Sequence, residues 1–138
     1  MKELWFYVCA VIIIILIAVI FMFFADNDGT EDKNIAFLEK YGWEVKPGFI
    51  ECEDIVIPEE FDDVYTDYND IQKAAGLDIE KYKGKRGVRY TYIVENYPDE
   101  TSESVRANVI CIDGIPVAGD IMTVGLHGFM YPLNHYAQ

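Results

Sequence analysis

The sequence predicts an α+β fold: an N-terminal transmembrane helix, then two helices packed on one antiparallel sheet that ends in a C-terminal three-stranded meander. Three observations predict it: a long uncharged run near the N-terminus, an amphipathic stretch after Pro58, and alternating apolar runs joined by Asp113-Gly114. The 138 residues leave room for one globular domain. We expect a cytoplasmic tip and transmembrane helix at residues 1–24, a linker at 25–31 and an extracytoplasmic α+β domain at 32–138.

The run from Leu4 to Phe24 predicts a membrane anchor. It contains no charged residue, Pro or Gly, and as a helix rising about 1.5 Å per residue it is roughly 31 Å long, close to the hydrocarbon thickness of a bilayer. A cleaved signal peptide has a shorter apolar region, about 7 to 15 residues, and a small-residue cleavage site, which Phe23 and Ala25 do not form. We therefore expect an uncleaved helix in the lipid bilayer.

Charge predicts the orientation of this anchor and excludes one class of partner. Lys2 precedes the apolar run and several acidic residues follow it, so the N-terminus is expected in the cytoplasm and the C-terminal domain outside it, at the cell membrane. Because the net charge is −13, nucleic acid is not expected as a partner.

Two helices are predicted outside the membrane. The stretch NIAFLEKYG (34–42) predicts a short helix that ends at Gly42. The second helix is expected to begin at Pro58, continue through acidic residues that suit a helix N-terminus, and stop at Gly76. Gln72 lies within its apolar stripe and is interpreted as a structural pin, because buried amides are usually hydrogen-bonded; a ligand contact is the alternative. The stripe comprises Phe61, Val64, Tyr65, Tyr68, Ile71 and Ala75.

The strands are predicted from alternation and turn residues. Apolar runs on both sides of Pro47-Gly48 predict two strands. Residues 87–98 alternate, with Arg89, Thr91 and Glu95 on the face expected to meet solvent, which predicts a half-buried strand. The runs VRANVICI and IPVAGDIMTV, joined by Asp113-Gly114, predict the hairpin that completes the meander. Residues 125–138 match no single pattern.

The cysteines and histidines limit the covalent and metal chemistry. Cys9 lies in the membrane run, so only Cys52 and Cys111 could form a disulfide outside the cytoplasm; each also fits a strand as a small apolar residue, and both readings stay open. His127 and His135 have no Cys or His at ligand spacing, so no metal site is predicted.

A basic cluster is the candidate binding site. It holds half of the positive charge that follows the membrane run and could bind an anionic envelope ligand or an acidic envelope protein; surface ion pairs with the neighbouring acidic helix are the alternative. Its members are Lys81, Lys83, Lys85, Arg86 and Arg89.

The sequence contains no catalytic or cofactor motif that we recognise. No nucleophile elbow, phosphate-binding glycine loop or zinc motif is present, so no cofactor is expected. His127 and Asp120 are the nearest candidates for an acid–base pair in a hydrolase or transferase. An isolated histidine among glycine and aromatic residues is more often packed than catalytic.

Several stretches together carry a family resemblance. The segments FLEKYGWEV, DYNDIQKAAGLDIEKYKGK, GIPVAGDI and HGFM resemble an exported family of Gram-positive bacteria catalogued as domain of unknown function 4830. The resemblance implies a short, membrane-anchored architecture and no specific chemistry. We expect a non-catalytic binding or accessory module of the bacterial cell envelope; an envelope enzyme and a structural subunit of a membrane complex are the alternatives.

Overall fold

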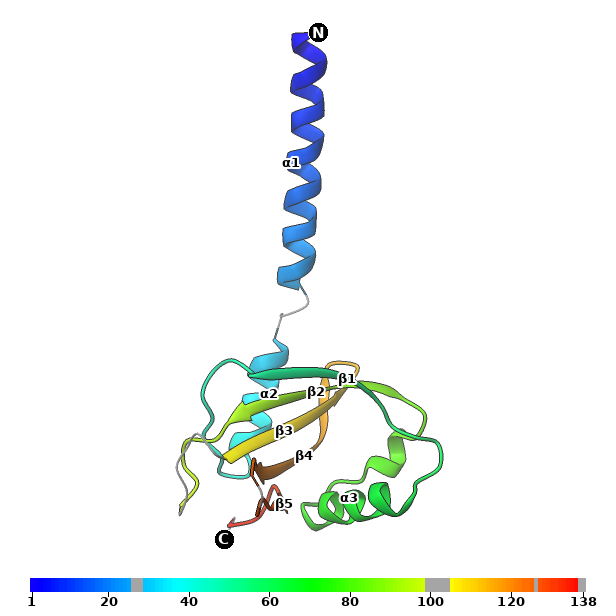
Figure 1. Cartoon of the computed structure of the whole chain (residues 1–138), viewed down its shortest axis with the longest axis vertical. Coiled ribbons are helices and arrows are strands. Elements are labelled where there is room, and N and C mark those ends of the chain that lie inside the picture. Colours follow the sequence, from blue (N-terminus) through cyan, green and yellow to red (C-terminus); the bar gives the residue numbers. More distant parts are fainter. Residues whose placement is uncertain (26–28, 99–104, 126, 137–138) are drawn as a thin grey trace.

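The computed structural model describes residues 1–25, 29–98, 105–125 and 127–136 of the chain. It has an α+β fold with an N-terminal apolar helix and a five-stranded antiparallel sheet (Figure 1). The helices are α1 (Lys2–Ala25), α2 (Thr30–Glu39), α3 (Asp63–Ala74) and the 3-10 helix η1 (Ile79–Tyr82); the strands are β1 (Glu51–Val56), β2 (Arg86–Ile93), β3 (Val105–Ile112), β4 (Ile115–Thr123) and β5 (Met130–Pro132).

The sheet is a meander in which every strand pairs with its neighbour in the sequence. The order β1-β2-β3-β4-β5 extends the expected three-stranded meander by one strand on each side. The predicted hairpin at Asp113-Gly114 is confirmed: both residues have positive φ (51° and 73°), and Ile112 pairs with Ile115. Turns of this kind match the twist of the flanking strands. A β-bulge next to Ile110 then shifts the β3–β4 register by one residue.

The two faces of the sheet are covered by different helices. On one face Leu38 of α2 packs with Tyr92, Val109 and Ile121 in the larger apolar core. On the other face Ile110 and its neighbours pack against α3 and η1 in a smaller cluster. The strand β2, expected to be half-buried, has buried residues on both faces, Tyr92 on one and Thr91 on the other.

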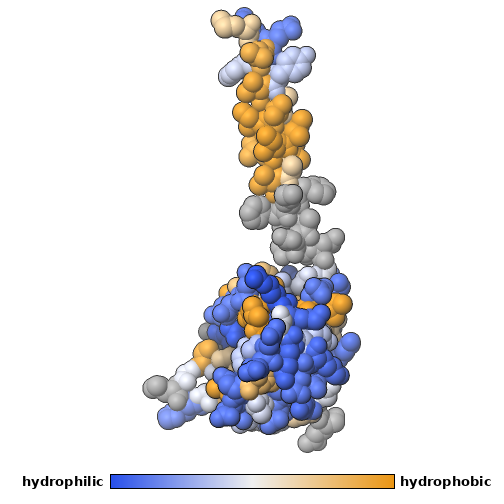
Figure 2. Space-filling model, turned by 90° about the vertical axis from the view of Figure 1, so that its right-hand side faces the viewer, coloured by the Kyte–Doolittle hydropathy of each residue, from blue (hydrophilic) through white to orange (hydrophobic). Residues whose placement is uncertain are grey.

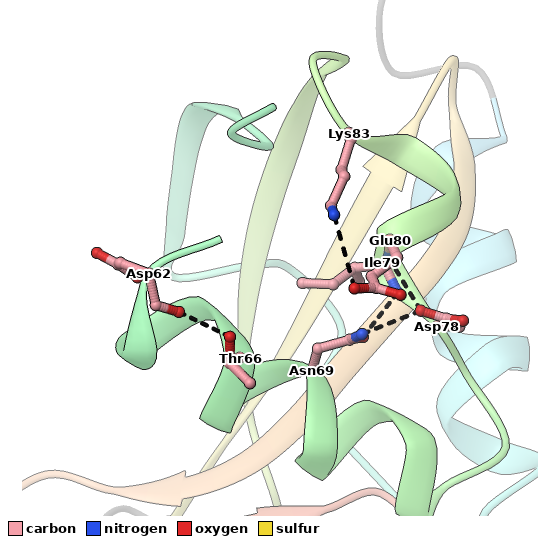
Figure 3. A network of polar contacts seen from close by, with 7 residues as sticks. All are labelled: Asp62, Thr66, Asn69, Asp78, Ile79, Glu80 and Lys83. Carbon is pink, nitrogen blue, oxygen red and sulfur yellow. Dashed lines mark hydrogen bonds and ion pairs between the residues drawn. The ribbon is translucent and has the colours of Figure 1, made fainter. Parts of the chain in front are cut away.

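The α3 segment is held by polar contacts at its start and at its connection to η1 (Figure 3). Asp62 is the N-cap, and its carboxylate accepts a hydrogen bond from the Tyr65 backbone N–H at 2.9 Å. Asn69, which is 2 % exposed, donates to the Asp78 carboxylate at 3.0 Å and accepts from the Ile79 N–H at 2.9 Å. These bonds fix η1 against α3.

Three local predictions were wrong. The helix α3 begins after Asp62 rather than at Pro58, because the Asp62 side chain supplies the cap. The stretch before Pro47-Gly48 forms only an isolated bridge from Val45 to Val94, so one strand follows the turn instead of two surrounding it. Val64, assigned to the buried stripe of α3, is 73 % exposed.

The boundaries of the other helices also differ from those expected. The helix α2 begins at Thr30, inside the stretch 25–31 expected as a linker, and residues 26–28 of that stretch lie outside the described residues. In α1, the 19 residues Lys2–Ile20 are long and apolar enough to cross a membrane. Figure 2 shows this apolar surface on α1, in contrast to the largely hydrophilic face of the folded part.

Candidate functional site

A cleft of about 650 Å³ lies between α3 and the sheet. Sites for small ligands have volumes of about 300–1,000 Å³ and apolar walls with a few polar groups. The polar lining includes Asp120, Arg89 and Arg106. The apolar lining comes from α3, from the segment after β1 and from the sheet, and comprises Ile55, Ile57, Val64, Tyr65, Ile71, Ile110, Met122, Val124 and Met130.

A row of polar side chains crosses the floor of this cleft. Thr91, Asn108 and Asp120 are register partners on β2, β3 and β4, so their side chains share one face of the sheet. Thr91 Oγ1 donates to Asn108 Oδ1 at 2.7 Å, and Asn108 Nδ2 donates to Asp120 Oδ1 at 3.0 Å. Tyr68 of α3 completes the row, since its hydroxyl donates to Asp120 Oδ2 at 2.9 Å. All four groups thus form one network that ends on a carboxylate.

The environment of Asp120 is unusual for a carboxylate. Asp120 is only 1 % exposed, and this burial raises its pKa above the ordinary aspartate value. The hydrogen bonds from Asn108 and Tyr68 and the positive charge of Arg89 partly counteract the rise. Burial, and then the nearby Asp120 carboxylate, raise the pKa of Tyr68 well above its ordinary value, which keeps the hydroxyl a donor. The row therefore places a buried, hydrogen-bonded carboxylate in the floor of the cleft.

Replacing Asp120 by Asn should stabilise the protein at pH 7 and have little effect near pH 3. Folding raises the pKa of Asp120. The contribution of Asp120 to stability is therefore complete below its unfolded pKa of about 3.9 and is lost as pH rises through its folded pKa. At pH values above the folded pKa, each unit by which folding raises the pKa of Asp120 lowers the free energy of unfolding by about 1.4 kcal/mol. The free energy of unfolding can be followed by Trp43 fluorescence in urea, in a Trp5→Phe background.

The control for this prediction is Asp54→Asn, because Asp54 is exposed on β1. This variant should change stability equally little at both pH values. A loss of stability in Asp120→Asn that is greater at pH 7 than at pH 3 would show that Asp120 is stabilising as a carboxylate, contrary to the prediction.

The predicted basic cluster does not form a single surface. Lys83 lies 3.6 Å from Glu80 and 4.6 Å from the centre of the Phe61 ring, and Arg89 forms an ion pair with Glu53. Alternation along β2 places Arg89 on the cleft face and Arg86 on the opposite face. The remaining members, Lys81 and Lys85, are exposed. Only Arg89 of the five lines the cleft.

The other candidate residues are placed as follows. His127 is exposed in the β4–β5 connection and does not line the cleft that Asp120 lines. Both Cys52 and Cys111 are free thiols. They lie on β1 and β3, with β2 between the two strands, and are also offset by two residues in register. The two strands alone are separated by about 9 Å, beyond the reach of a disulfide. Among the described residues, no group of three or more His, Cys, Asp or Glu is placed to hold a metal ion.

Gln72 is fully buried on α3, beside β4. Its Oε1 accepts a hydrogen bond from the Gly119 backbone N–H at 2.9 Å. Its Nε2 has no partner within the part of the chain that the structure describes. If Oε1 and Nε2 of Gln72 were exchanged, the amide NH2 would face the Gly119 N–H, and two donors would meet. The contact with Gly119 therefore determines the orientation of the Gln72 amide.

Sequence reasoning missed most of the polar row. Thr91 is predicted on a solvent face, yet it is 5 % exposed and lies in the floor of the cleft. Asn108 lies in the run VRANVICI, where two polar residues at alternate positions, Arg106 and Asn108, were the available signal. Tyr68 was assigned to the core without a polar role.

Comparison with known proteins matched the chain to a protein family. Neither curated proteins nor solved structures gave a match. A family model matches residues 37–121, a region that contains α3 and all four members of the polar row. Since this is more than half of the 138 residues, the chain belongs to the family described as Domain of unknown function (DUF4830).

Proposed function

We propose that this protein is a membrane-anchored binding module of the bacterial cell envelope, and that the cleft between α3 and the sheet is its binding site. The supporting observation is the hydrogen-bonded row from Thr91 to Asp120 on the floor of an otherwise largely apolar cleft. Apolar walls with a few oriented polar groups are typical of ligand sites. A sheet needed only for packing would bury apolar residues there, since a buried carboxylate costs free energy.

The proposed location rests on α1 and on charge. The segment Lys2–Ile20 could anchor the chain, with Lys2 favouring a cytoplasmic N-terminus. The domain would then lie outside the cytoplasm, where its ligand would be a component of the envelope. We propose no catalytic step, because His127 is not a lining residue of the cleft.

Two reporter cysteines test both the location and the binding site. In a Cys52→Ser background, Val64→Cys places a thiol at the cleft mouth, and Ile115→Cys places one at the start of β4; the two native residues are 73 % and 59 % exposed. A membrane-impermeant maleimide should label both reporters in intact cells of the native host. Relative to Ile115→Cys, Val64→Cys should react several-fold more slowly in cells than in the purified full chain, because a ligand covers the cleft in cells.

The native thiols cause little interference in this experiment. Cys111 is buried, and burial raises its pKa to about 11, so little reactive thiolate is present at neutral pH. If neither reporter is labelled until the cells are lysed, the proposed location is wrong. If both are labelled but their relative rates are the same in cells and in purified protein, the cleft is not the binding site.

A further inference from the structure

The charges around the cleft are arranged asymmetrically. On α3, Asp67 lines the cleft, and Asp63 and Asp70 lie about one turn before and after it on the same stripe of the helix. On the opposite side, Glu51 and Glu53 of the edge strand β1 are exposed on the cleft face of the sheet. Carboxylates therefore border the cleft along two sides.

The positive charges in the cleft are fewer than the carboxylates on its borders. The lining contains two guanidinium groups, from Arg89 and Arg106, and Arg89 already pairs with Glu53. Four of the five bordering carboxylates lie outside that ion pair, and the chain has a net charge of −13, so the local field favours positive ligands and repels anionic ones. A negatively charged wall polymer is thus a poor fit to this cleft.

Apolar surface continues from the cleft onto its mouth. Val64, Val124 and Met130 line the cleft and are 73 %, 56 % and 42 % exposed. Contiguous apolar groups bordered by polar residues are typical of interaction surfaces. Methionines such as Met122 and Met130 adapt their shape to apolar partners. The ligand must therefore have apolar groups for the cleft and its mouth, and positive groups for both borders.

The spacing of the carboxylates favours a peptide over a small cation. From Asp63 to Asp70 the helix rises roughly 10 Å, and Glu51 and Glu53 are separated by roughly 7 Å along β1. A single ammonium group cannot reach carboxylates distributed over these distances and over both borders. Basic side chains repeated along a polypeptide can, while its apolar side chains enter the cleft.

From this geometry we infer that the cleft binds a cationic amphipathic peptide segment of a partner protein, an inference that rests on the proposed function. Apolar side chains of the segment pack between α3 and the sheet, against Ile71 and Met122. Its Lys and Arg side chains pair with Asp67 on one border and Glu51 on the other. The polar row below supplies hydrogen-bond groups at the floor.

The test uses the full chain in nanodiscs of zwitterionic lipid and two fluorescent amphipathic peptides, one of Leu and Lys and one of Leu and Glu in the same pattern. Fluorescence anisotropy, corrected for empty nanodiscs, should show salt-sensitive binding of the Lys peptide and none of the Glu peptide. The double variant Glu51→Gln, Asp67→Asn should weaken binding of the Lys peptide roughly five- to tenfold, since exposed charge pairs each contribute modestly.

The matched control removes two carboxylates from α2, on the other face of the sheet. Asp32→Asn, Glu39→Gln changes the net charge equally and alters two exposed residues, so it should leave peptide binding almost unchanged. If both double variants weaken binding equally, net charge alone explains the effect and the inference is overturned. Equal binding of the Lys and Glu peptides would also overturn it. Hexylammonium carries one positive charge on a short apolar chain. If it binds to the cleft and neither peptide does, the inference is also overturned.

Failure of this inference can be told apart from failure of the proposed function. If Val64→Cys is protected in cells but the Lys peptide does not bind, the cleft is a binding site for a different class of ligand. If Val64→Cys is not protected and the peptide does not bind, both proposals fail.

Discussion

Replacing Gly119 by Ala is expected to destabilise the domain by about 3 kcal/mol or more. A Cβ at this position would lie 2.6 Å from the Asn108 carbonyl oxygen and 2.9 Å from Leu133 Cδ1. The first contact is with backbone inside the sheet, so β3 and β4 would have to separate. Separation would also disturb the bond from the Gly119 N–H to Gln72. Since most domains are stable by only about 5–15 kcal/mol, urea unfolding followed by Trp43 fluorescence should show a large shift.

Two further variants identify the cause of this loss. Ile115→Ala changes an exposed residue on the same strand and should alter stability by about 0.5 kcal/mol or less. Leu133→Ala removes one of the two clashes, so combining it with Gly119→Ala should cost less than the sum of the single effects. Some loss should remain, because the clash with the Asn108 carbonyl is unchanged. Wild-type stability of Gly119→Ala would contradict the short distance between the Gly119 position and the Asn108 carbonyl oxygen.

The elements that sequence predicted well have local signals. The Asp113-Gly114 hairpin follows from two residues that tolerate positive φ, and the end of α3 follows from Gly76, whose φ is 79°. The strands β3 and β4 follow from β-rich apolar runs on either side of that turn. In each case the controlling interaction lies within a few residues in the sequence.

The polar row could not be predicted, because its register depends on a bulge. Continued without interruption from Asp113-Gly114, the β3–β4 register would place Gly119 opposite Asn108. The bulge next to Ile110 instead places Asp120 there. A one-residue shift also exchanges the faces to which side chains point, so Asp120 reaches the cleft face only because of the bulge. Pro116, which pairs with Cys111 beside the shift, is compatible with a bulge because proline donates no backbone hydrogen bond, but it does not by itself fix the register.

The covering of both sheet faces was also beyond local reasoning. Alternation in β2 separates Tyr92 from Thr91 but does not show whether the second face meets solvent or another element. Here α3 packs on β4 and β5 of the same sheet, so that face of β2 lines a cleft in which Thr91 is buried and Arg89 is a lining residue. The predicted basic cluster assumed that its five residues share a surface, which strand alternation in β2 prevents.

Replacing Gln72 by Glu is expected to destabilise the protein strongly at pH 7 and only slightly below pH 4. The substitution keeps an acceptor for the Gly119 N–H but replaces the buried Nε2 by a carboxylate oxygen. Full burial removes the water that stabilises a charged carboxylate, so the glutamate is expected to be protonated in the folded state. The free energy of protonating an ordinary glutamate at pH 7 is about 4 kcal/mol, and this is the largest loss of stability that the buried charge can cause.

The sign of the pH dependence separates this effect from a loss of packing. A glutamate whose folded pKa is raised loses its stabilising contribution as pH rises above its unfolded pKa of about 4.3, so the destabilisation should grow between pH 4 and pH 7. The matched variant Gln72→Met removes the bond to Gly119 and also the unpartnered amide nitrogen. Losing the acceptor for the Gly119 N–H destabilises the protein, and removing the unpartnered nitrogen stabilises it, each by about 1–3 kcal/mol. The net effect of Gln72→Met on stability should therefore be smaller than that of Gln72→Glu and independent of pH. Wild-type stability of Gln72→Glu at pH 7 would mean that water or a cation reaches this site, and the structural role of Gln72 would have to be abandoned.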